Sequence, residues 1–541
     1  MRGVPDTTGK ARKWKHLLLG VLLLSNLLYV GMIIARSPDT LRSSFRVSES
    51  QDTSLDHIDG RSDQVLANAT SPSQIPDLPS NPLKTRRLKC LGWRATAACS
   101  PDGAPIPQND HDCNSKIPYG SSGYCEVEDE DTQERFRVMK RTCAKAKAGA
   151  VVQCSDAPGF ANFRVEADQV VDKALSPKFQ LPNVNTSQHN SQRGIVMVVY
   201  PKLVASAYAT IRTLRDVLGC RLPIEIWFRP DEMRRSPEGL EPLKNLSRTG
   251  QLTFQEINDP KAVRFNAKIY ALYHSMFDQV LFLDADNVPV RDPTYLFETP
   301  EFKKTGAVFW PDYWHPDHTI FFINADSLVW QLLAMPYVDM FEQESGQVLV
   351  DRKRHAAPLE LVRFYGFHEP NYFGRMKLAW GDKDMFRFAW LKLNVPFHMI
   401  QTPPSVAGIM FGDSFCGMTM VQHDTDGEVL FLHRNQMKLT GENRTDLSSE
   451  LKNSTDEYPD PAMWSNLVSF RNTSARSDYV IQANTDHRFS KQRRCFGRQF
   501  PDKSAHFYSR AVEDLSFAGI ETHLRRFAME AATKFTNKTL N

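Results

Sequence analysis

The 541-residue sequence has little net charge, few cysteines and only one long apolar run. Its 66 basic and 63 acidic side chains leave a net charge of +3, which gives no support for nucleic-acid binding. A mean hydropathy of −0.42 with a single apolar run excludes a polytopic membrane protein. Hydrophobic residues make up 41% and charged residues 24% of the chain, which excludes a wholly disordered protein.

The one apolar run, Leu17–Ala35, contains 19 residues without a charge. At about 1.5 Å per residue, such a helix spans about 30 Å, the thickness of a bilayer core. Five basic residues precede it against one acid, which predicts a cytoplasmic tail (1–16), a transmembrane signal anchor (17–35) and a lumenal remainder, the single-pass type II topology. A cleaved signal peptide is the alternative, but the run is long for one and Ile33-Ile34-Ala35 is a poor cleavage site.

The segment after the anchor, residues 36–88, is rich in Ser, Asp, Pro and Asn and predicts a disordered stem. Seven N-x-S/T sequons fit a glycosylated lumenal chain, although each is a weak signal alone. They are Asn68, Asn185, Asn245, Asn443, Asn453, Asn472 and Asn537.

Six of the nine cysteines lie in one block, residues 89–160, and none of their spacings is C-x-x-C. Zinc is therefore disfavoured, and an oxidising lumen favours disulfides, with fifteen pairings open. The six are Cys90, Cys99, Cys113, Cys125, Cys143 and Cys154. Three further cysteines lie outside the block, an odd number, so at least one thiol stays free or pairs elsewhere. The block is either a structural staple or a binding module.

The middle of the chain alternates apolar β-branched runs with segments of helical spacing, which predicts a parallel or mixed α/β sheet. The expected strands are 194–200, 222–228, 252–257, 280–283 and 306–310, and the expected helices are 204–218 and 266–277. The C-terminal extension, 441–541, shows little periodicity before Pro501 and a helical pattern over 505–527.

Asp284 and Asp286 follow directly on the expected strand 280–283. Ligand sites in such sheets lie beyond the carboxyl ends of the strands, and two carboxylates at i and i+2 on one turn can hold one divalent cation. D-x-D alone is a weak signal, because a solvated turn capped by Asn287 gives the same pattern.

Five blocks over residues 193–438 carry a family resemblance. They are LFLDADNVPVRDPTYLFETPEF, TGAVFWPDYW, ESGQVLVDR, GDKDMF and FLHRNQMK. In this order they resemble the Golgi α-mannosyltransferases of fungi, above all the α-1,2-mannosyltransferases that start N-glycan branches. The resemblance implies a GT-A fold over 190–440, a Rossmann-like mixed sheet flanked by helices. It also implies Golgi localisation, GDP-mannose as donor, Mn²⁺ as metal, a glycan or glycoprotein acceptor, and retention of the anomeric configuration.

The resemblance also points to the residues that meet the metal and the donor. His433 ends a short apolar strand, 429–432, and its imidazole suits manganese as a third ligand beside Asp284 and Asp286. Lys438 then meets the diphosphate as a point charge, and Lys268 approaches the sugar nucleotide from the preceding helix. The alternative to these functional roles is a structural role for the histidine and a solvent-exposed position for each lysine.

Glu344 and Gln347 lie in the ESGQVLVDR strand, which is expected to line the sugar pocket. Gln347 suits sugar hydroxyls, and its alternative is a polar residue at a strand edge.

Asp382 and Asp384 open an amphipathic helix, 385–393, where the resemblance places the meeting of sugar and acceptor. We expect at least one of them to be catalytic, with a slight preference for Asp384, by positioning the acceptor hydroxyl or stabilising an oxocarbenium-like transition state. The alternative is capping of the helix.

Asp312, Tyr313 and Trp314 form the candidate acceptor platform, because sugars stack on aromatic faces. The alternative is an aromatic core cluster.

Two other functions stay open at this point. One is a GT-A hexosyltransferase that uses a UDP-sugar, because no motif reads the base. The other is a non-enzymatic lumenal protein that binds calcium through the acidic turn and glycan through the cysteine block. The turn lacks the alternating oxygens and downstream Glu of an EF-hand loop. The oligomeric state is not predicted.

Overall fold

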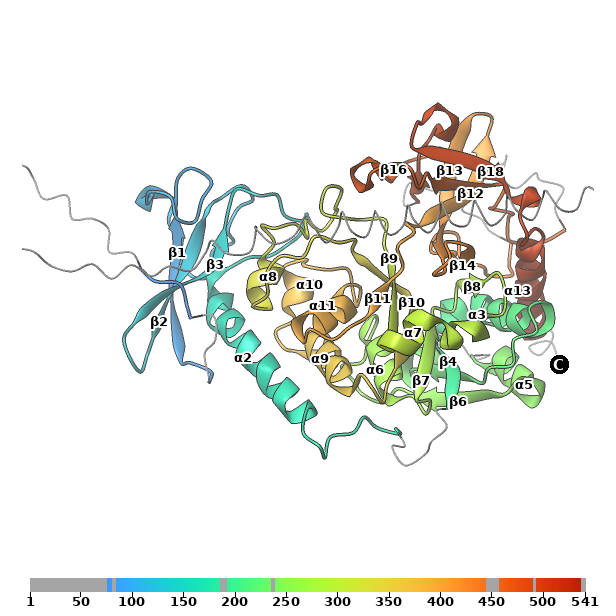
Figure 1. Cartoon of the computed structure of the whole chain (residues 1–541), viewed down its shortest axis with the longest axis horizontal. Helices are drawn as coiled ribbons and strands as arrows, with labels where there is room; N and C mark the ends of the chain where they lie inside the picture. Colours follow the sequence, from blue (N-terminus) through green and yellow to red (C-terminus); the bar gives the residue numbers. More distant parts are fainter. Residues whose placement is uncertain are drawn as a thin grey trace, which may run out of the picture. The chain divides into compact units, whose positions relative to one another are not determined.

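The computed structural model describes residues 75–79, 84–184, 192–234, 239–443, 457–489 and 493–536 (Figure 1). The predicted cytoplasmic tail, the signal anchor at 17–35 and most of the stem lie outside the described residues, as do the sequons at Asn68, Asn185, Asn453 and Asn537. Among the residues that are described, no helix has the length and apolar character needed to cross a membrane.

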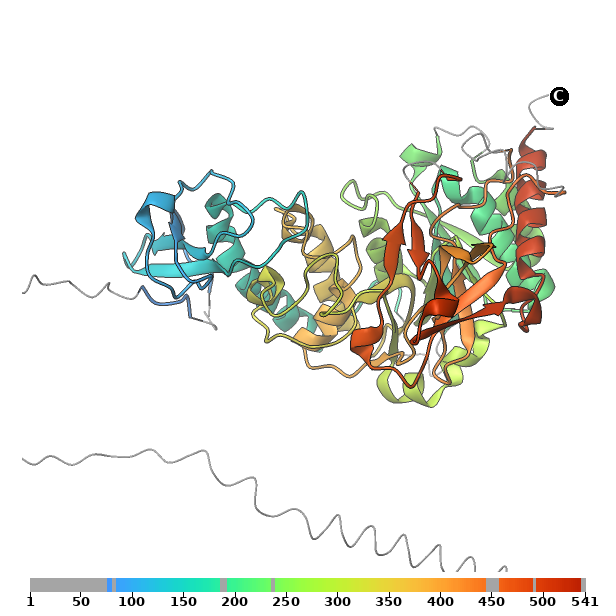
Figure 2. The ribbon, with the colours of Figure 1, turned by 90° about the horizontal axis from the view of Figure 1, so that it is seen from above.

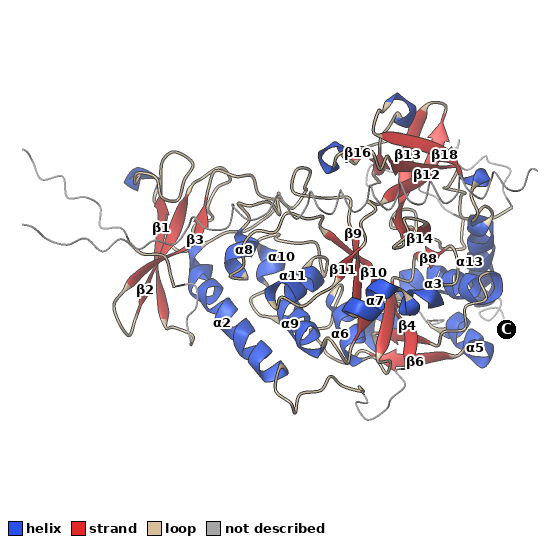
Figure 3. Cartoon of the chain, in the orientation of Figure 1, coloured by secondary structure: helices blue, strands red, loops and turns tan. Residues whose placement is uncertain are grey.

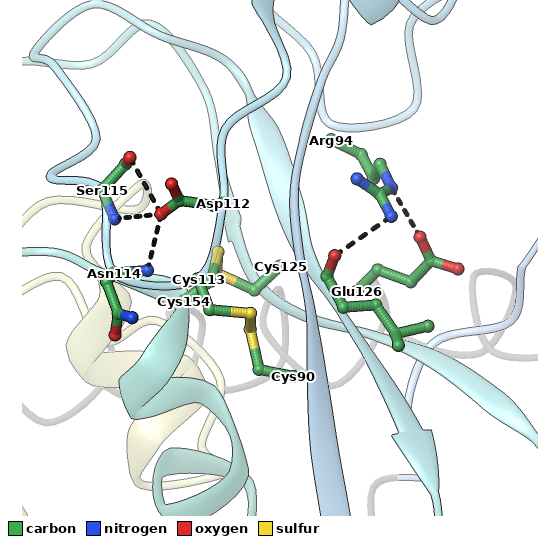
Figure 4. The surroundings of a disulfide bond; sticks show 10 residues. Cys90, Arg94, Asp112, Cys113, Asn114, Ser115, Cys125, Glu126 and Cys154 are labelled. Atoms are coloured by element: carbon green, nitrogen blue, oxygen red, sulfur yellow. Dashed lines mark hydrogen bonds and ion pairs between the residues drawn. A yellow bond between two sulfur atoms is a disulfide. The ribbon is translucent and has the colours of Figure 1, made fainter.

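The cysteine-rich block folds as a small antiparallel sheet followed by a long helix. The sheet order is β1 (Leu88–Ala95), β2 (Gly123–Asp129) and β3 (Arg135–Arg141), and the helix is α2 (Ala157–Ala174). Two short 3₁₀ turns lie at Pro107–Asn109 and Cys154–Asp156. Three disulfides cross-link the block: Cys90–Cys113, Cys99–Cys143 and Cys125–Cys154. Figure 4 shows two of these pairs beside the Arg94–Glu126 ion pair that joins β1 to β2.

The predicted disulfides in this block are therefore confirmed, and the structure supplies the pairing that the sequence left open. Outside the block, Cys416 pairs with Cys495, and Cys220 is free and buried.

A seven-stranded mixed sheet forms the centre of the fold, in the order β11-β9-β10-β7-β4-β5-β6. β4, β5, β6 and β7 run parallel, whereas β10 runs antiparallel to both β7 and β9. The strands are β4 (Arg193–Val198), β5 (Ile224–Phe228), β6 (Leu252–Glu256), β7 (Gln279–Leu283), β9 (Ala307–Pro311), β10 (Gln343–Asp351) and β11 (His398–Met399). The expected mixed α/β architecture is confirmed.

Helices cover both faces of this sheet, which explains the continuous apolar runs of its strands. Along β4, Ile195 and Met197 enter one hydrophobic core and Val196 enters the other. Figure 3 shows α9 to α11 between the three-stranded and seven-stranded sheets. The helices are α3 (Val204–Arg212), α4 (Pro230–Met233), α5 (Glu241–Gly250), α6 (Asn266–His274), α7 (Pro300–Thr305), α8 (Leu328–Leu332), α9 (Ala356–Phe367), α10 (Tyr372–Arg375) and α11 (Met385–Lys392).

A second, largely antiparallel sheet follows in the order β16-β17-β13-β12-β15-β18, with β14 paired to β13 and to β8. Its strands are β8 (Asn287–Pro289), β12 (Ser405–Phe411), β13 (Ser414–His423), β14 (Val429–His433), β15 (Asn466–Phe470), β16 (Gln482–Asn484), β17 (Cys495–Gly497) and β18 (Phe507–Ala511). The last described element is α13 (Ile520–Thr536), which packs against α3, as Figures 1 and 2 both show.

The helix expected over 505–527 is wrong in its first half. Residues 507–511 form β18, paired with β15, and helix begins only at Ile520. The strand Phe-Tyr-Ser-Arg-Ala contributes one deeply buried residue, Phe507, so its apolar signal is weak.

Candidate active site

The acidic turn joins the two sheets. β7 is a buried apolar strand that ends at Leu283, and Asp284 to Asp286 lead from it into β8. The Asp284 N–H donates to the Gly346 carbonyl of neighbouring β10 at 2.8 Å, and the Asn287 N–H donates to the Asp284 carbonyl at 2.9 Å. The turn is thus fixed by backbone hydrogen bonds to the sheet.

His433 reaches this turn because β14 pairs with β8, where Asn287 and His433 are opposite each other. The Arg434 N–H donates to the Asp286 carbonyl at 2.9 Å and closes the arrangement. His433 Nε2 lies 3.5 Å from Asp286 Oδ1 and 3.7 Å from Asp284 Oδ2. A residue 147 positions downstream is therefore brought to the D-x-D turn by one strand pairing.

These three residues fit a divalent metal. One ligand atom from each of Asp284, Asp286 and His433 lies within 4.8 Å of the other two. Two carboxylates and an imidazole are a donor set that suits Mn²⁺. Burial lowers the pKa of His433 below its ordinary value, against the carboxylates of Glu344 and Asp284. The imidazole is thereby kept neutral, the form in which histidine ligates metals.

Gly346 makes room for the imidazole. A Cβ at this position would lie 2.6 Å from His433 Nδ1, closer than non-bonded atoms approach. The glycine of ESGQ is thus a site residue that pattern reading passed over.

A pocket of about 740 Å³ opens in front of the turn, at the carboxyl ends of the parallel strands. The chain builds the sheet from β4 outward to β6 and then returns to place β7 on the other side of β4. Such a switch point is where ligands bind in open α/β sheets. The pocket is lined by Tyr200 after β4, Arg229 after β5, Phe265 and Lys268 at α6, both aspartates of the turn, and Lys438.

Two lysines of the pocket pair with the two aspartates. Lys268 Nζ lies 2.7 Å from Asp284 Oδ2, and Lys438 forms an ion pair with Asp286. Burial alone would lower the pKa of Lys268, but Asp284 and Asp382 outweigh it and hold that pKa above its ordinary value. Both lysines expected to meet the donor therefore lie at the acidic turn, and Lys268 carries its charge at neutral pH.

Glu344 and Asp312 lie behind the turn rather than in the open pocket. Lys383 joins them, with Nζ 2.5 Å from Glu344 Oε2 and 2.7 Å from Asp312 Oδ2. Burial alone would raise the pKa of Glu344, but Lys383 and His433 hold it at about 2. Glu344 Oε1 is 3.7 Å from His433 Nδ1, so its charge lies on the far side of the imidazole from the aspartates. Lys383 was not predicted, and its only signal is a lysine between two aspartates.

Gln347 is fully buried, and its Oε1 accepts a hydrogen bond from Asn287 Nδ2 at 2.6 Å. The same Nδ2 donates to the Gly346 carbonyl at 2.9 Å. Gln347 and Asn287 thus hold the acidic turn against β10. The Gln347 Nε2 has no hydrogen-bond partner among the described residues.

Asp382 and Asp384 occupy different surroundings. Asp384 begins α11 in a left-handed conformation (φ 63°), where it accepts from the Gln343 N–H at 2.8 Å and from Arg387 Nε at 2.5 Å. Asp382 is 2% exposed, and neither carboxylate oxygen makes a well-formed hydrogen bond to another described residue. Lys268 Nζ lies 4.0 Å from its Oδ1. Burial raises the pKa of Asp382 to about 6, against the opposing effect of Lys268.

The aromatic residues expected to form an acceptor platform are buried. Tyr313 and Trp314 belong to a hydrophobic cluster of the second sheet, where Tyr313 stacks on Phe496 with ring centres 6.0 Å apart. Exposed aromatic surface lies instead at Trp380, two residues before Asp382, and at Phe265, with ring centres 6.3 Å apart. The sequon asparagines Asn245, Asn443 and Asn472 are exposed.

The part of the chain that carries the acidic turn is similar in sequence to known proteins. Residues 192–424 match the model of a family described as "Mannosyltransferase putative". Alpha-1,2-mannosyltransferase MNN5 of Saccharomyces cerevisiae is 26% identical over 308 residues, 46% of this chain and 52% of MNN5. Alpha-1,2-mannosyltransferase MNN24 of Candida albicans is 30% identical over 242 residues, 38% of this chain and 34% of MNN24. Through this segment, the chain is similar to the fungal α-1,2-mannosyltransferases.

The family resemblance predicted from the five blocks is thereby confirmed. A more distant relative in this set is named as an α-1,3-mannosyltransferase, MNN14 of Candida albicans, at 26% identity over 245 residues. The chain spans about half or less of the length of the curated relatives it matches. Among solved structures, the mannosyltransferase Ktr4p of S. cerevisiae in complex with GDP matches at 12% identity, over 47% of this chain and 81% of that chain, with a TM-score of 0.28.

Proposed function

We propose that this protein is a metal-dependent α-mannosyltransferase of the GT-A class, which transfers mannose from GDP-mannose to a glycan acceptor with retention of configuration. The observation that carries the proposal is the Asp284–Asp286–His433 group. Its two aspartates line a pocket of about 740 Å³ and lie in the segment that matches a mannosyltransferase family. The α-1,2 linkage follows the named relatives, and the guanine base follows the family resemblance of the five sequence blocks.

The charge of the pocket supports a nucleoside diphosphate as ligand. Three acids line it, Glu232, Asp284 and Asp286, against five cations, Lys202, Arg229, Arg264, Lys268 and Lys438. A divalent metal on the two aspartates compensates their charge and leaves the lysines to face an anion. When bound, such a metal stabilises the negative charge that develops on a departing diphosphate.

The chain's own residues then divide the work. Lys268 and Lys438 pair with Asp284 and Asp286, the two aspartates proposed to hold the metal. Because a bound metal would neutralise these carboxylates, the two lysines are then available to bind phosphate oxygens. Glu344 maintains the orientation of His433 from behind, as outer carboxylates do for metal-bound histidines. Gln347 and Asn287 keep the acidic turn in place.

Asp382 is the better catalytic candidate of the two aspartates. Asp384 is committed to Arg387 and to the start of α11, whereas Asp382 has unused acceptor oxygens beside Lys268. A buried carboxylate without a well-formed hydrogen bond is a costly arrangement unless a ligand completes it. We assign Asp382 to the acceptor hydroxyl or to the positive charge that develops on the mannose ring.

Trp380 and Phe265 are the aromatic surface beside this position, and we assign the acceptor sugar to them rather than to Tyr313 and Trp314. The four disulfides fit an oxidising compartment. With the predicted anchor at 17–35, they support a lumenal, type II protein of the Golgi membrane.

The test is incubation of the protein with a panel of nucleotide sugars, Mn²⁺ and a mannose-terminated acceptor. We expect GDP release and an α-linked mannose product with GDP-mannose alone, and loss of both with a chelator. UDP release without GDP release would favour the UDP-sugar alternative. Calcium binding without release of any nucleotide would favour the non-enzymatic alternative.

A further inference from the structure

A second, smaller site lies away from the proposed donor pocket, between the cysteine-rich block and the helices beside it. A cavity of about 50 Å³ is lined by Arg141, Lys145 and Lys147 at the end of the block, and by Phe321, Asp326 and Lys377 opposite. A water needs roughly 10–15 Å³ of such volume, so the cavity holds about three to five water-sized groups. That is the size of a small oxyanion rather than of a sugar.

Arg141 is the decisive residue of this cavity. Its side chain is 7% exposed, yet it forms no ion pair with the described part of the chain, and its buried Nη1 has no hydrogen-bond partner there. Burial lowers the pKa of Arg141 below that of a free guanidinium, the direction expected for a desolvated cation without a carboxylate beside it. Removing a guanidinium from water is unfavourable unless an anion is paired with it.

The contrast with neighbouring arginines shows how unusual this is. On the same strand, β3, Arg135 pairs with Glu126 and Glu128, and Arg137 pairs with Asp77 and Asp102. Both of those arginines are more exposed than Arg141, although exposed arginines need partners less.

The surroundings of Arg141 add charge of the same sign. Lys145, Lys147 and Lys377 line the cavity, and none of them pairs with a carboxylate among the residues described. Lys147 Nζ lies 4.9 Å from the centre of the Phe321 ring. Against these four cations stands one acid, Asp326, so the lining of the cavity has a strong excess of positive charge.

The walls of the cavity are held in place from both sides. The Lys140 N–H donates to Gln331 Oε1 of α8 at 2.9 Å, and Gln331 Nε2 donates to the Lys140 carbonyl at 2.7 Å. The Val151 N–H donates to the Arg375 carbonyl at 2.9 Å. The Cys99–Cys143 disulfide anchors the segment that carries the lysines. The cavity that Arg141 and the three lysines line is thus bounded by fixed segments of backbone.

We propose that this cavity binds a phosphate-type oxyanion, with Arg141 as the central donor. A guanidinium offers paired N–H groups that match two oxygens of a phosphate. The charge excess favours a dianion over a single carboxylate. Two sources share this chemistry, free inorganic phosphate and a phosphate group carried on a glycan.

The experiment is thermal unfolding of the full-length protein in detergent, at constant ionic strength, with increasing inorganic phosphate. Phosphate should raise the unfolding temperature of the wild type and of Arg135→Gln, the matched control on the same strand. In Arg141→Gln, the phosphate concentration needed for the same shift should rise by at least about tenfold. Without phosphate, Arg141→Gln should unfold at the same or a higher temperature than the wild type, because an unpaired buried charge is removed.

A second variant covers the case in which Arg141→Gln does not fold. Lys145→Gln/Lys377→Gln changes two side chains that line the cavity, and it should weaken the phosphate effect several-fold. The proposal is overturned if phosphate fails to stabilise the wild type, or if Arg141→Gln responds like the control. It is also overturned if the response is lost in Lys438→Gln and kept in Arg141→Gln, because phosphate would then bind in the donor pocket.

The source is distinguished by repeating the titration with mannose 6-phosphate, an arm that rests on the proposed glycan acceptor. Tighter binding of the sugar phosphate than of inorganic phosphate, lost in Arg141→Gln, identifies a glycan-borne phosphate. Equal affinities identify the free ion. Phosphate binding at Arg141 stands independently of the transferase proposal, whose test is nucleotide release.

Discussion

The cysteine-rich block and the seven-stranded sheet are stabilised in different ways. The block has a three-stranded sheet, a single long helix and three disulfides. The seven-stranded sheet is covered by helices on both faces, and no described disulfide involves it. A small sheet buries little apolar surface and needs cross-links, whereas a large one buried on both faces does not.

The two regions also position the side chains of their candidate sites in different ways. The acidic turn, His433 and Lys268 are positioned by strands and helices of the large core, through backbone hydrogen bonds and strand register. Arg141 and its lysines are positioned by a strand end and a disulfide. The proposed donor site should therefore keep its structure when the disulfides are reduced, and the block should keep its structure when metal is removed.

The largest effect that separates the two regions is expected from Asp286→Asn. This change removes a negative charge and an oxygen of the proposed metal site at the end of a buried strand, where the carboxylate is already positioned. Loss of one preorganised electrostatic contact lowers the rate by roughly 10²–10³, and loss of the metal lowers it further. Transfer should be measured across a manganese titration.

The control for this variant is the folding of the seven-stranded sheet itself. The hydrogen-exchange protection of this sheet should be unchanged in Asp286→Asn, which shows that the region around the acidic turn is folded. Normal transfer at every manganese concentration would contradict the assignment, because Asn can cap the turn but is a poor replacement for a charged ligand.

Much of the central sheet could be predicted from the sequence, because a strand buried on both faces is a continuous apolar run. The strands around 194–200, 222–228 and 280–283 are found at or near the predicted ranges. The second sheet was largely missed, since several of its strands are short and half-exposed, such as β16 and β18. The pairing of these strands joins segments far apart in the sequence, which a local sequence pattern cannot predict.

The candidate site shows the same division. Asp284 and Asp286 follow a recognisable strand, and His433 with Lys438 came from the family resemblance. Lys383 and Gly346 were not singled out, and Asn287 was considered only as a turn cap, because their roles depend on contacts across strands far apart in sequence. Whether a polar residue faces the pocket or the interior, as with Asp382 and Asp384, is decided by the start of α11 in three dimensions.

The next largest effect is expected in the block, from the double variant Cys125→Ala/Cys154→Ala. The bond closes a separation of 29 residues, for which the chain-entropy relation gives about 3–4 kcal/mol of stabilisation. The block should lose hydrogen-exchange protection, while GDP and manganese affinity stay within about twofold of the wild type. If nucleotide binding fails together with the block, the two regions are not independent.

A slightly smaller loss of folding stability than in the disulfide variant is expected for the large core at low pH. His355 is buried near the end of β10, its Nε2 is 2.8 Å from the Thr305 carbonyl oxygen, and burial lowers its pKa to about 4. The unfolded chain takes up a proton near pH 6.5 and the folded chain only near pH 4, so the stability contributed above pH 6.5 is lost as pH falls through this window. The loss amounts to about 3 kcal/mol.

Chemical denaturation from pH 7.5 to 4.5 measures this slope. His355→Gln should flatten it, and His487→Gln, a change at an exposed histidine, should leave it as it is. An unchanged slope in His355→Gln would show that other groups carry the acid sensitivity of the large core.

The smallest effect concerns Cys220, the cysteine of the large core that forms no disulfide in the described structure. It is fully buried, its Sγ lies 3.8 Å from Thr294 Oγ1, and burial raises its thiol pKa above the ordinary value. Because the thiolate is the reactive form, a thiol reagent should label no cysteine in the native protein and one cysteine per chain after unfolding without reductant. Cys220→Ala should abolish that label and lower stability by roughly 1 kcal/mol, since it removes one small buried group. Rapid labelling of Cys220 under native conditions would show that this part of the core opens more readily than the cross-linked block, which reverses the comparison.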